Sequence, residues 1–259
     1  MPLIDPVRLH TLLGPATGRF DVDSTELCDS TNSELLRRAD QGAPSGTVLV
    51  ADRQSAGRGR RGRQWIAEPE DALMFSLLWR FEGSATRLAG LSLAVGVAVA
   101  QALETLGIKG VALKWPNDVL LGQGKLAGIL VELSSDRRGT LTVIGIGLNL
   151  AAPRTPLPQA AAGLSDATPQ IPERHALLAQ LLIALAAVFD RFAQGGFAAL
   201  QSAWQSRHAW QGRPVSVLLD GEREACGICL GADEDGALLV DTGEGPQRFL
   251  SGDLSLRPA

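Results

Sequence analysis

Four arginines alternate with glycines in one short stretch of the chain, residues 57–65, which reads Gly-Arg-Gly-Arg-Arg-Gly-Arg-Gln-Trp. A strand-like apolar run, residues 47–52, leads into it. Glycine has no Cβ and lets the backbone approach a ligand closely, while guanidinium groups bind anions through charge-assisted hydrogen bonds. We therefore expect this stretch, the arginine loop, to clasp an anionic ligand. A solvated surface loop is the alternative, and the glycine spacing and Trp65 count against it.

Two common nucleotide-binding motifs can be set aside. Gly57, Gly59 and Gly62 match the spacing of the dinucleotide-binding fingerprint, but arginines fill its packing positions and the segment 65–69 follows in place of a helix. A P-loop needs Ser or Thr after its lysine, and here Lys125 is followed by Leu126. A nucleotide would therefore have to bind without either device.

Two of the three lysines lie in further polar segments of unusual composition. Lys114-Trp-Pro-Asn-Asp118 brings an ammonium and a carboxylate together between two predicted strands. Asp118 is a candidate magnesium ligand, because Mg²⁺ bound with phosphates usually takes only one or two carboxylates. A turn aspartate that bonds its own backbone is an equal alternative.

Lys125 opens an apolar strand, residues 126–131, and should be partly buried. Burying an unpaired ammonium is costly, so Lys125 should have an anionic partner. Glu132 lies seven residues further along the same strand, which is too far for direct pairing.

The composition is that of an ordinary globular protein of 259 residues, with 45% hydrophobic and 20% charged residues. The formal net charge of −4 gives no general attraction to nucleic acid, so the arginine loop is a local exception. No signal peptide is evident at the N-terminus. The apolar runs Leu88–Leu103 and Leu177–Phe189 are predicted to be core helices, too short to span a membrane. A cytoplasmic protein without a membrane partner is expected.

The apolar pattern predicts an α+β fold, in which helices flank a central mixed or antiparallel sheet. One helix should begin at the Thr-x-x-Glu capping pattern of residues 31–34. The other expected helices are 6–13, 88–106, 172–192 and 197–207. The expected strands are 20–27, 47–52, 72–80, 111–114, 119–121, 129–133 and 141–146.

Beyond Gly212 the chain changes to short strand candidates divided by tight turns, which predicts a small β-barrel. Cys226 and Cys229 form a C-x-x-C pattern inside one of these strands. A redox site should open a helix, and a zinc site needs a second pair of ligands. Because residues three apart on a strand point to opposite faces, we interpret both cysteines as small strand residues.

Five segments, taken together and in order, resemble the signature blocks of bacterial biotin–protein ligases, the biotin–[acetyl-CoA-carboxylase] ligases. The blocks are Ser30–Asn32, Gln54–Trp65, Lys114–Asp118, Lys125–Glu132 and Gly145–Asn149. The resemblance covers about residues 20–257. It implies a biotin- and ATP-binding catalytic domain over residues 1–210 and a small SH3-like C-terminal β-barrel domain over residues 213–259.

The resemblance implies a two-step reaction. The carboxylate of biotin attacks the α-phosphorus of ATP to give biotinyl-5'-adenylate and pyrophosphate, and a lysine of a carrier protein then takes the biotinyl group. Lys125, Arg58 and Arg60 would be catalytic, and Asp118 would bind the metal. The implied ATP-binding residues are Arg58, Arg60, Arg61, Lys114, Asn117 and Asn149. The implied biotin-binding residues are Ser30, Thr31, Asn32, Gln54, Gly57, Arg58, Gly59, Arg60, Trp65, Lys125, Gly128 and Ile129.

ATP, Mg²⁺ and biotin would then be substrates and metal, with no tightly bound prosthetic group. The acceptor would be a biotin carboxyl carrier protein domain, and the enzyme a monomer or homodimer. About 25 residues precede the first block, too few for the helix-turn-helix of bifunctional members, so DNA binding by that route is not expected. The form without that domain is the monofunctional one.

Two departures from the family pattern stand out. The loop at 150–164 has no aromatic residue to cover adenine, which we expect to pack on aliphatic groups instead. His208 stands where many relatives have an acidic residue.

Two rival functions remain at this point. A lipoate–protein ligase would use similar carrier chemistry, although the complete arginine loop and the appended barrel favour biotin. A nucleic-acid-binding module using the arginine loop and the barrel is the alternative from another class, and the net charge of −4 disfavours it.

Overall fold

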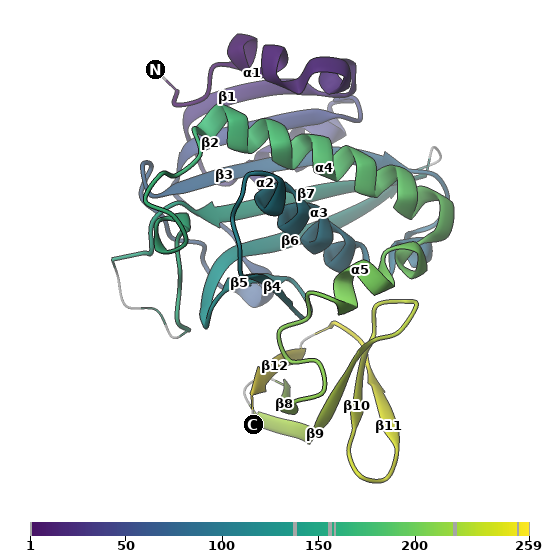
Figure 1. The fold of residues 1–259 in the computed structure, drawn as a ribbon. Coiled ribbons are helices and arrows are strands. Elements are labelled where there is room, and N and C mark those ends of the chain that lie inside the picture. Colours follow the sequence, from purple (N-terminus) through teal and green to yellow (C-terminus); the bar gives the residue numbers. More distant parts are fainter. Residues whose placement is uncertain are drawn as a thin grey trace.

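A computed structural model describes residues 2–136, 139–154, 157, 159–219, 222–252 and 254–258. It contains a seven-stranded sheet of order β1-β2-β3-β7-β6-β5-β4 and a five-stranded sheet of order β11-β10-β9-β8-β12. In the larger sheet β1 and β2 pair in parallel, and the other neighbours are antiparallel. The smaller sheet lies beyond α5 at one end of the molecule (Figure 1). The predicted α+β class with a mixed sheet is confirmed.

The strands of the larger sheet are β1 (Asp21–Cys28), β2 (Thr47–Gln54), β3 (Ala72–Phe81), β4 (Val111–Lys114), β5 (Asp118–Leu121), β6 (Gly124–Asp136) and β7 (Gly139–Asn149). The α-helices are α1 (Pro6–Leu13), α2 (Thr31–Asp40), α3 (Leu91–Thr105), α4 (Arg174–Gly195) and α5 (Gln201–Gln205). The smaller sheet contains β8 (Pro214–Leu219), β9 (Glu222–Ala232), β10 (Leu238–Asp241), β11 (Pro246–Phe249) and β12 (Leu254–Pro258).

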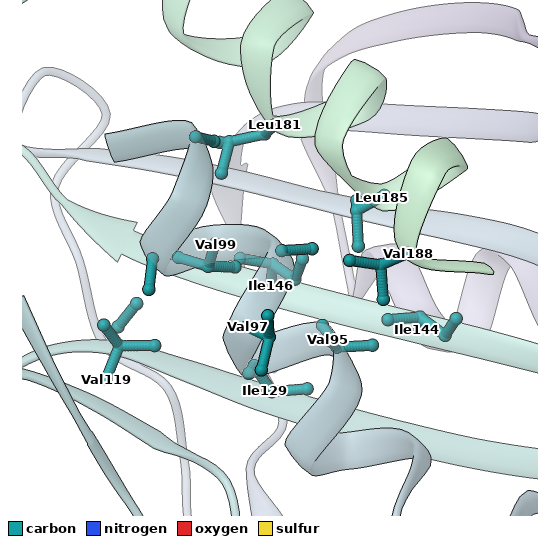
Figure 2. Close-up of a cluster of buried hydrophobic side chains, with 14 of the residues drawn as sticks. Val95, Val97, Val99, Val119, Ile129, Ile144, Ile146, Leu181, Leu185 and Val188 are labelled. Carbon is teal, nitrogen blue, oxygen red and sulfur yellow. The ribbon is translucent and has the colours of Figure 1, made fainter. Parts of the chain in front are cut away.

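The two faces of the larger sheet bury different amounts of apolar surface. Side chains of α1, α3 and α4 pack on one face in a large core, and Figure 2 shows α3 and α4 valines and leucines beside Ile144 and Ile146. The opposite face carries a smaller cluster around Leu35 of α2. Because successive strand residues point to opposite faces, Leu77 joins the first core and Leu78 the second.

Two long apolar helices form the centre of the larger core. The stretches Ala85–Thr105 and Arg174–Gly195 are long and apolar enough to cross a membrane by length and composition, so the expectation that these runs are too short is wrong. In the structure, however, 67% and 56% of the apolar 18-residue window in each stretch is buried. They pack against the sheet as the predicted core helices.

The start of α2 differs from its prediction. Thr31 is not a helix cap: the N-cap residue is Ser30, and no side chain caps the helix there. The hydroxyl of Thr31 faces Gln54 and Ser76 instead, at 3.2 and 2.7 Å. The Thr31 side chain, which the Thr-x-x-Glu pattern assigned to capping, therefore makes tertiary contacts instead.

The two cysteines of the C-x-x-C pattern point to opposite sides of β9, as predicted, with Cys229 buried and Cys226 exposed. Both are free thiols. His208 lies beside Cys229, and its ring stacks on Trp204 with ring centroids 4.4 Å apart. Burial lowers the pKa of His208 to about 4, so this imidazole is neutral and belongs to the packing between the two sheets.

Candidate active site

Glycines on β6 and β7 form the floor of a first cavity. Gly128 pairs with Gly147 across the two strands, and Gly145 lies two residues away. A Cβ on Gly145 would lie 2.2 Å from the Asn32 amide oxygen, and one on Gly147 would lie 2.4 Å from the Trp65 indole ring. Real side chains do not approach so closely, so the glycines keep this face of the sheet open.

Polar groups from α2 and β2 form the wall of this first cavity. The Thr31 backbone N–H donates to Gln54 Oε1 at 2.8 Å. The Ser76 hydroxyl lies 2.7 Å from Thr31 Oγ1 and 2.5 Å from Asn32 Oδ1. Ser30, like its neighbours, is buried. Buried polar groups connected in this way hold one geometry, because breaking a single bond leaves a partner unsatisfied.

The arginine loop closes over the glycine floor. The Gly59 N–H donates to the Arg63 carbonyl at 2.7 Å, and the Trp65 N–H donates to the Gly57 carbonyl at 3.0 Å. A Cβ on Gly57 would lie 2.4 Å from the Trp65 carbonyl oxygen, so only glycine fits at the base of the loop. Arg61 takes left-handed backbone angles, with φ 60° and ψ 37°, a conformation in which L-residues other than glycine are uncommon.

The first two arginines of this loop are held by different acceptors. Arg58 donates from both terminal nitrogens to Glu132, at 2.8 and 3.1 Å. Arg60 donates to Asn117 Oδ1 at 3.2 Å and to the backbone carbonyls of Ser251 and Gly252. One arginine is thus bound by a carboxylate of β6, and the other connects the loop to the C-terminal segment.

A lysine–aspartate–lysine cluster lies beside the first cavity. Lys125 Nζ is 2.6 Å from Asp118 Oδ1, and Lys114 Nζ is 3.1 Å from Asp118 Oδ2. The β5–β6 hairpin creates this arrangement, because it folds Lys125 back to pair with Leu120, close to Asp118. The expectation that Lys125 has an anionic partner is met by Asp118 within the protein.

Burial and charge act against each other in this cluster. Burial works to raise the pKa of Asp118, but the charges of Lys125 and Lys114 outweigh it and lower that pKa to about 2. Burial lowers the pKa of Lys114 to about 8, and the nearby Arg257 adds to the effect while Asp118 opposes it. The carboxylate is therefore fixed in its charged form, whereas Lys114 can lose its proton in mildly alkaline solution.

Asp118 does not fit the expected role of magnesium ligand. Both of its oxygens face lysine ammonium groups, and a divalent cation there would lie beside two positive charges. Within the described ranges, no group of three or more His, Cys, Asp or Glu side chains could hold a metal ion. The geometry fits the alternative of a structural carboxylate, although its partners are lysines and not its own backbone.

A second cavity adjoins the first. Lys114 and Asp118 line one side, and the C-terminal strand β12 contributes Leu254 and Arg257. The apolar lining includes Ile66, together with aliphatic side chains such as Leu157 and Leu254. The two cavities meet at five shared residues: Gly59, Arg60, Trp65, Asn117 and Lys125.

The structure brings most of the predicted site residues together. The first cavity is lined by every predicted biotin-binding residue except Gly57, which lies at the base of the loop. Of the predicted ATP-binding residues, Arg60, Lys114, Asn117 and Asn149 line the second cavity. Arg58 lines only the first, and Arg61 is not among the described lining residues of either.

Asn149 makes structural hydrogen bonds that the sequence did not reveal. Its amide nitrogen donates to the carbonyls of Lys125 and Ala162, at 3.2 and 3.0 Å. It therefore connects the start of β6 to the segment that follows β7. Part of the loop at 150–164 (residues 155, 156 and 158) lies outside the described residues.

The sequence prediction missed several residues that shape the cavities. Gly145 and Gly147 belong to a recognised block, and their alternation within a strand is a signal for an open sheet face. Ser76 carries no comparable signal, because its partners come from a distant segment. Glu132 ends a recognised block, but its pairing with Arg58 also joins distant segments. The contribution of Arg257 to the second cavity likewise depends on the packing of β12.

Fold and site define a class of protein. The sequence profile of the biotin/lipoate A/B protein ligase family matches residues 24–149, and that of the biotin protein ligase C-terminal domain matches residues 212–257. The chain belongs to this family.

The sequence is 37% identical over 264 residues to the bifunctional ligase/repressor BirA of Escherichia coli, covering 99% of this chain and 81% of that protein. It is 34% identical to the biotin–[acetyl-CoA-carboxylase] ligase of Mycobacterium tuberculosis, covering 93% of this chain and 91% of that one. The fold matches the biotin protein ligase of Aquifex aeolicus in complex with biotin and ATP, with a TM-score of 0.78 and 32% identity over 92% of this chain and 99% of that chain.

Proposed function

We propose that the protein is an ATP-dependent biotin–protein ligase, which activates biotin to biotinyl-5'-adenylate and transfers biotin to a lysine of a biotin carboxyl carrier protein. The observation that carries the proposal is the junction of the two cavities. Lys125 and Arg60 line both. A carboxylate bound in the first cavity and an α-phosphate bound in the second would meet beside these two cations.

The reaction needs alignment and charge neutralisation more than proton transfer. When a biotin carboxylate oxygen bonds to the α-phosphorus, the bond to pyrophosphate breaks, and both partners are anionic. Lys125, fixed by its 2.6 Å contact with Asp118, would lie beside the reacting oxygens without having to reorient. Charges arranged in advance stabilise a transition state without reorganisation at the moment of reaction.

The first cavity suits biotin in shape and chemistry. Its glycine floor leaves a flat apolar surface, and its wall offers the polar groups of Thr31, Asn32 and Gln54. The Trp65 indole N–H is buried without a hydrogen-bond partner among the described residues. A small ring system with one polar edge and a carboxylated tail fits such a site.

The second cavity suits the nucleotide. Lys114, Arg60 and Arg257 supply positive charge for the phosphates. Aliphatic side chains, among them Ile66 and Leu254, are available to pack on adenine. Magnesium is expected to enter with ATP, and we assign it no protein ligand.

The names of the Mycobacterium tuberculosis and Aquifex aeolicus relatives favour biotin over lipoate, although the family description includes both. Several narrower points stay predictions: the division into domains at residues 1–210 and 213–259, the SH3-like form of the barrel, the cytoplasmic location, the monomeric or homodimeric state, and the lack of DNA binding.

The proposal can be tested by mixing the protein with a biotin carboxyl carrier domain, Mg-ATP and either biotin or lipoate. We expect biotin, and not lipoate, to become attached to the carrier lysine, as detected by intact mass. Biotin should also stimulate exchange of pyrophosphate into ATP. Lipoate attachment without biotin attachment would assign the chain to the other branch of the family. A carrier domain with Arg in place of its acceptor lysine is the control.

A further inference from the structure

We propose that Glu132 is a positioning residue, which tethers the arginine loop to the wall of the biotin cavity before substrate arrives. This inference rests on the proposed function where it concerns biotin. The tether itself does not depend on which ligand the cavity binds.

The contacts of Glu132 join two parts of the site. Its Oε1 accepts a hydrogen bond from Arg58 Nη2 at 2.8 Å. Its Oε2 accepts one from Arg58 Nη1 at 3.1 Å and another from the Asn32 amide at 2.9 Å. One carboxylate therefore holds both a loop side chain and a wall side chain.

The position of Glu132 follows from the alternation of β6. Gly128, Leu130 and Glu132 are two residues apart, and such residues lie on one face of a strand. Gly128 and Leu130 line the first cavity. Asn32 also lies 3.4 Å from the Leu130 carbonyl oxygen, which keeps its amide directed at this strand. Glu132 thus stands at the edge of the cavity, where the arginine loop crosses the sheet.

Glu132 leaves Arg58 able to bind a ligand. A guanidinium has five N–H donors, and the paired contact with Glu132 uses the two terminal nitrogens. The Nε edge is not used in this pairing. Arg58 can therefore receive an anion from the side while Glu132 fixes its orientation, which lowers the entropy lost when the ligand binds.

The negative charge of Glu132 holds the Arg58 guanidinium, because both oxygens of its carboxylate accept hydrogen bonds from Arg58. The side-chain partners of Arg58 among the described residues are Glu132 and, at 3.3 Å, Ser33. Removing the charge at position 132 should therefore loosen the Arg58 end of the loop.

Limited trypsin digestion of the ligand-free protein tests the tether directly, because trypsin cuts after arginine and the loop holds four arginines. Glu132→Gln keeps the size of the side chain and removes its charge. We expect cleavage within residues 57–65 to become about three- to tenfold faster, since partly exposed ion pairs contribute modestly. Glu132→Asp, which keeps the charge, should show a smaller increase.

Asp190→Asn is the matched control, because it breaks a similar paired contact with Arg19, at 2.7 Å for both bonds, outside the site. It should leave cleavage of the loop unchanged. Unchanged cleavage in Glu132→Gln, or equal acceleration at sites throughout the chain, would overturn the tether.

A second readout connects the tether to biotin. Glu132→Gln should raise the Kd for biotin by about three- to tenfold and leave the KM for ATP near that of the parent. In an Arg58→Met, Asn32→Ala background, the same change should have little further effect on the Kd. An equal rise in both constants would contradict a role in positioning. If the parent fails to bind biotin, the proposed function falls, while the digestion still decides the tether.

Discussion

The arginine loop and the lysine cluster serve the same junction of two cavities, but they are held in opposite ways. Arg58 lies at the surface, 44% exposed, and reaches Glu132 across the sheet edge. Lys114 and Asp118 are only 4% and 10% exposed, and Lys125 is 27% exposed. One set of cations is paired at the surface, and the other is paired largely inside the protein.

The difference suits two separate tasks. Exposed ion pairs contribute little stability, so an opening of the loop would cost little. Under the proposed function, such an opening would admit biotin, and closure would retain the intermediate. A buried cluster is costly to disturb, which keeps Lys125 in one place for the chemical step. We therefore expect changes in the lysine cluster to affect rate and folding, and changes in the loop to affect retention of the intermediate.

Loss of Lys125 should have the largest effect on catalysis. We expect Lys125→Ala to slow formation of the adenylate about 100- to 1000-fold, because a charge arranged for the transition state is removed. Biotin-dependent release of pyrophosphate measures this step. Asp118 keeps Lys114 as a partner, so the melting temperature should change little. Lys109→Ala, at an exposed lysine, is the control. A near-normal rate would make Lys125 a structural residue.

Loss of the Asp118 charge should mainly affect folding. Asp118→Asn leaves two ammonium groups without their counter-ion, and we expect the free energy of unfolding to fall by about 3 kcal/mol. Urea denaturation at pH 7 measures the change, with Asp190→Asn as the control at an exposed pair. If Asp118 instead bound magnesium, the variant would keep its stability and need more Mg²⁺ for activity. That result would contradict the role of Asp118 as the counter-ion that fixes the two lysines.

Loss of Arg60 should release the intermediate. Biotinyl-adenylate is a mixed anhydride that reacts with amines, so an enzyme must retain it until the acceptor arrives. We expect Arg60→Gly to increase the release of biotinyl-adenylate about 10- to 100-fold, because the loss of one charged hydrogen bond weakens binding by about that factor. Synthesis of the adenylate should continue. Labelling of serum albumin, which contains no carrier domain, reports the leak. Labelling no greater than that by the parent enzyme would remove Arg60 from this role.

The smallest effect should come from pH. Burial lowers the pKa of Lys114 to about 8, so raising the pH from 7 to 9 removes most of its charge. If that charge helps to hold ATP, the KM for ATP should rise by up to about tenfold across this range, since only the protonated form would bind well. Lys114→Arg, which stays charged, should flatten the profile. An equal rise in Lys114→Arg would show that another group titrates.

The sequence was informative where the signal is local. The helix at Pro6–Leu13 has the predicted bounds, because Asp5 caps it and Pro6 suits its first turn. The five motif blocks identified the family, and nearly all of their predicted biotin contacts line one cavity. Glycine spacing, arginine density and apolar periodicity are properties of neighbouring residues, so they can be read without coordinates.

Pairings between distant residues could not be obtained in this way. The sequence rejected Glu132 as a partner for Lys125, correctly, but the true partner is Asp118, which a hairpin with an irregular register brings within 2.6 Å. Glu132 in turn pairs with Arg58, 74 residues away. Thr31 was expected to cap a helix, but its hydroxyl instead contacts Gln54 and Ser76.

The amino-acid sequence by itself thus determined which chemical groups the site contains and in which order they occur along the chain. The tertiary structure decided which charges neutralise one another and which remain for a substrate. The physical reason is that electrostatic energy depends on separation and burial, and strand register and sheet packing set both.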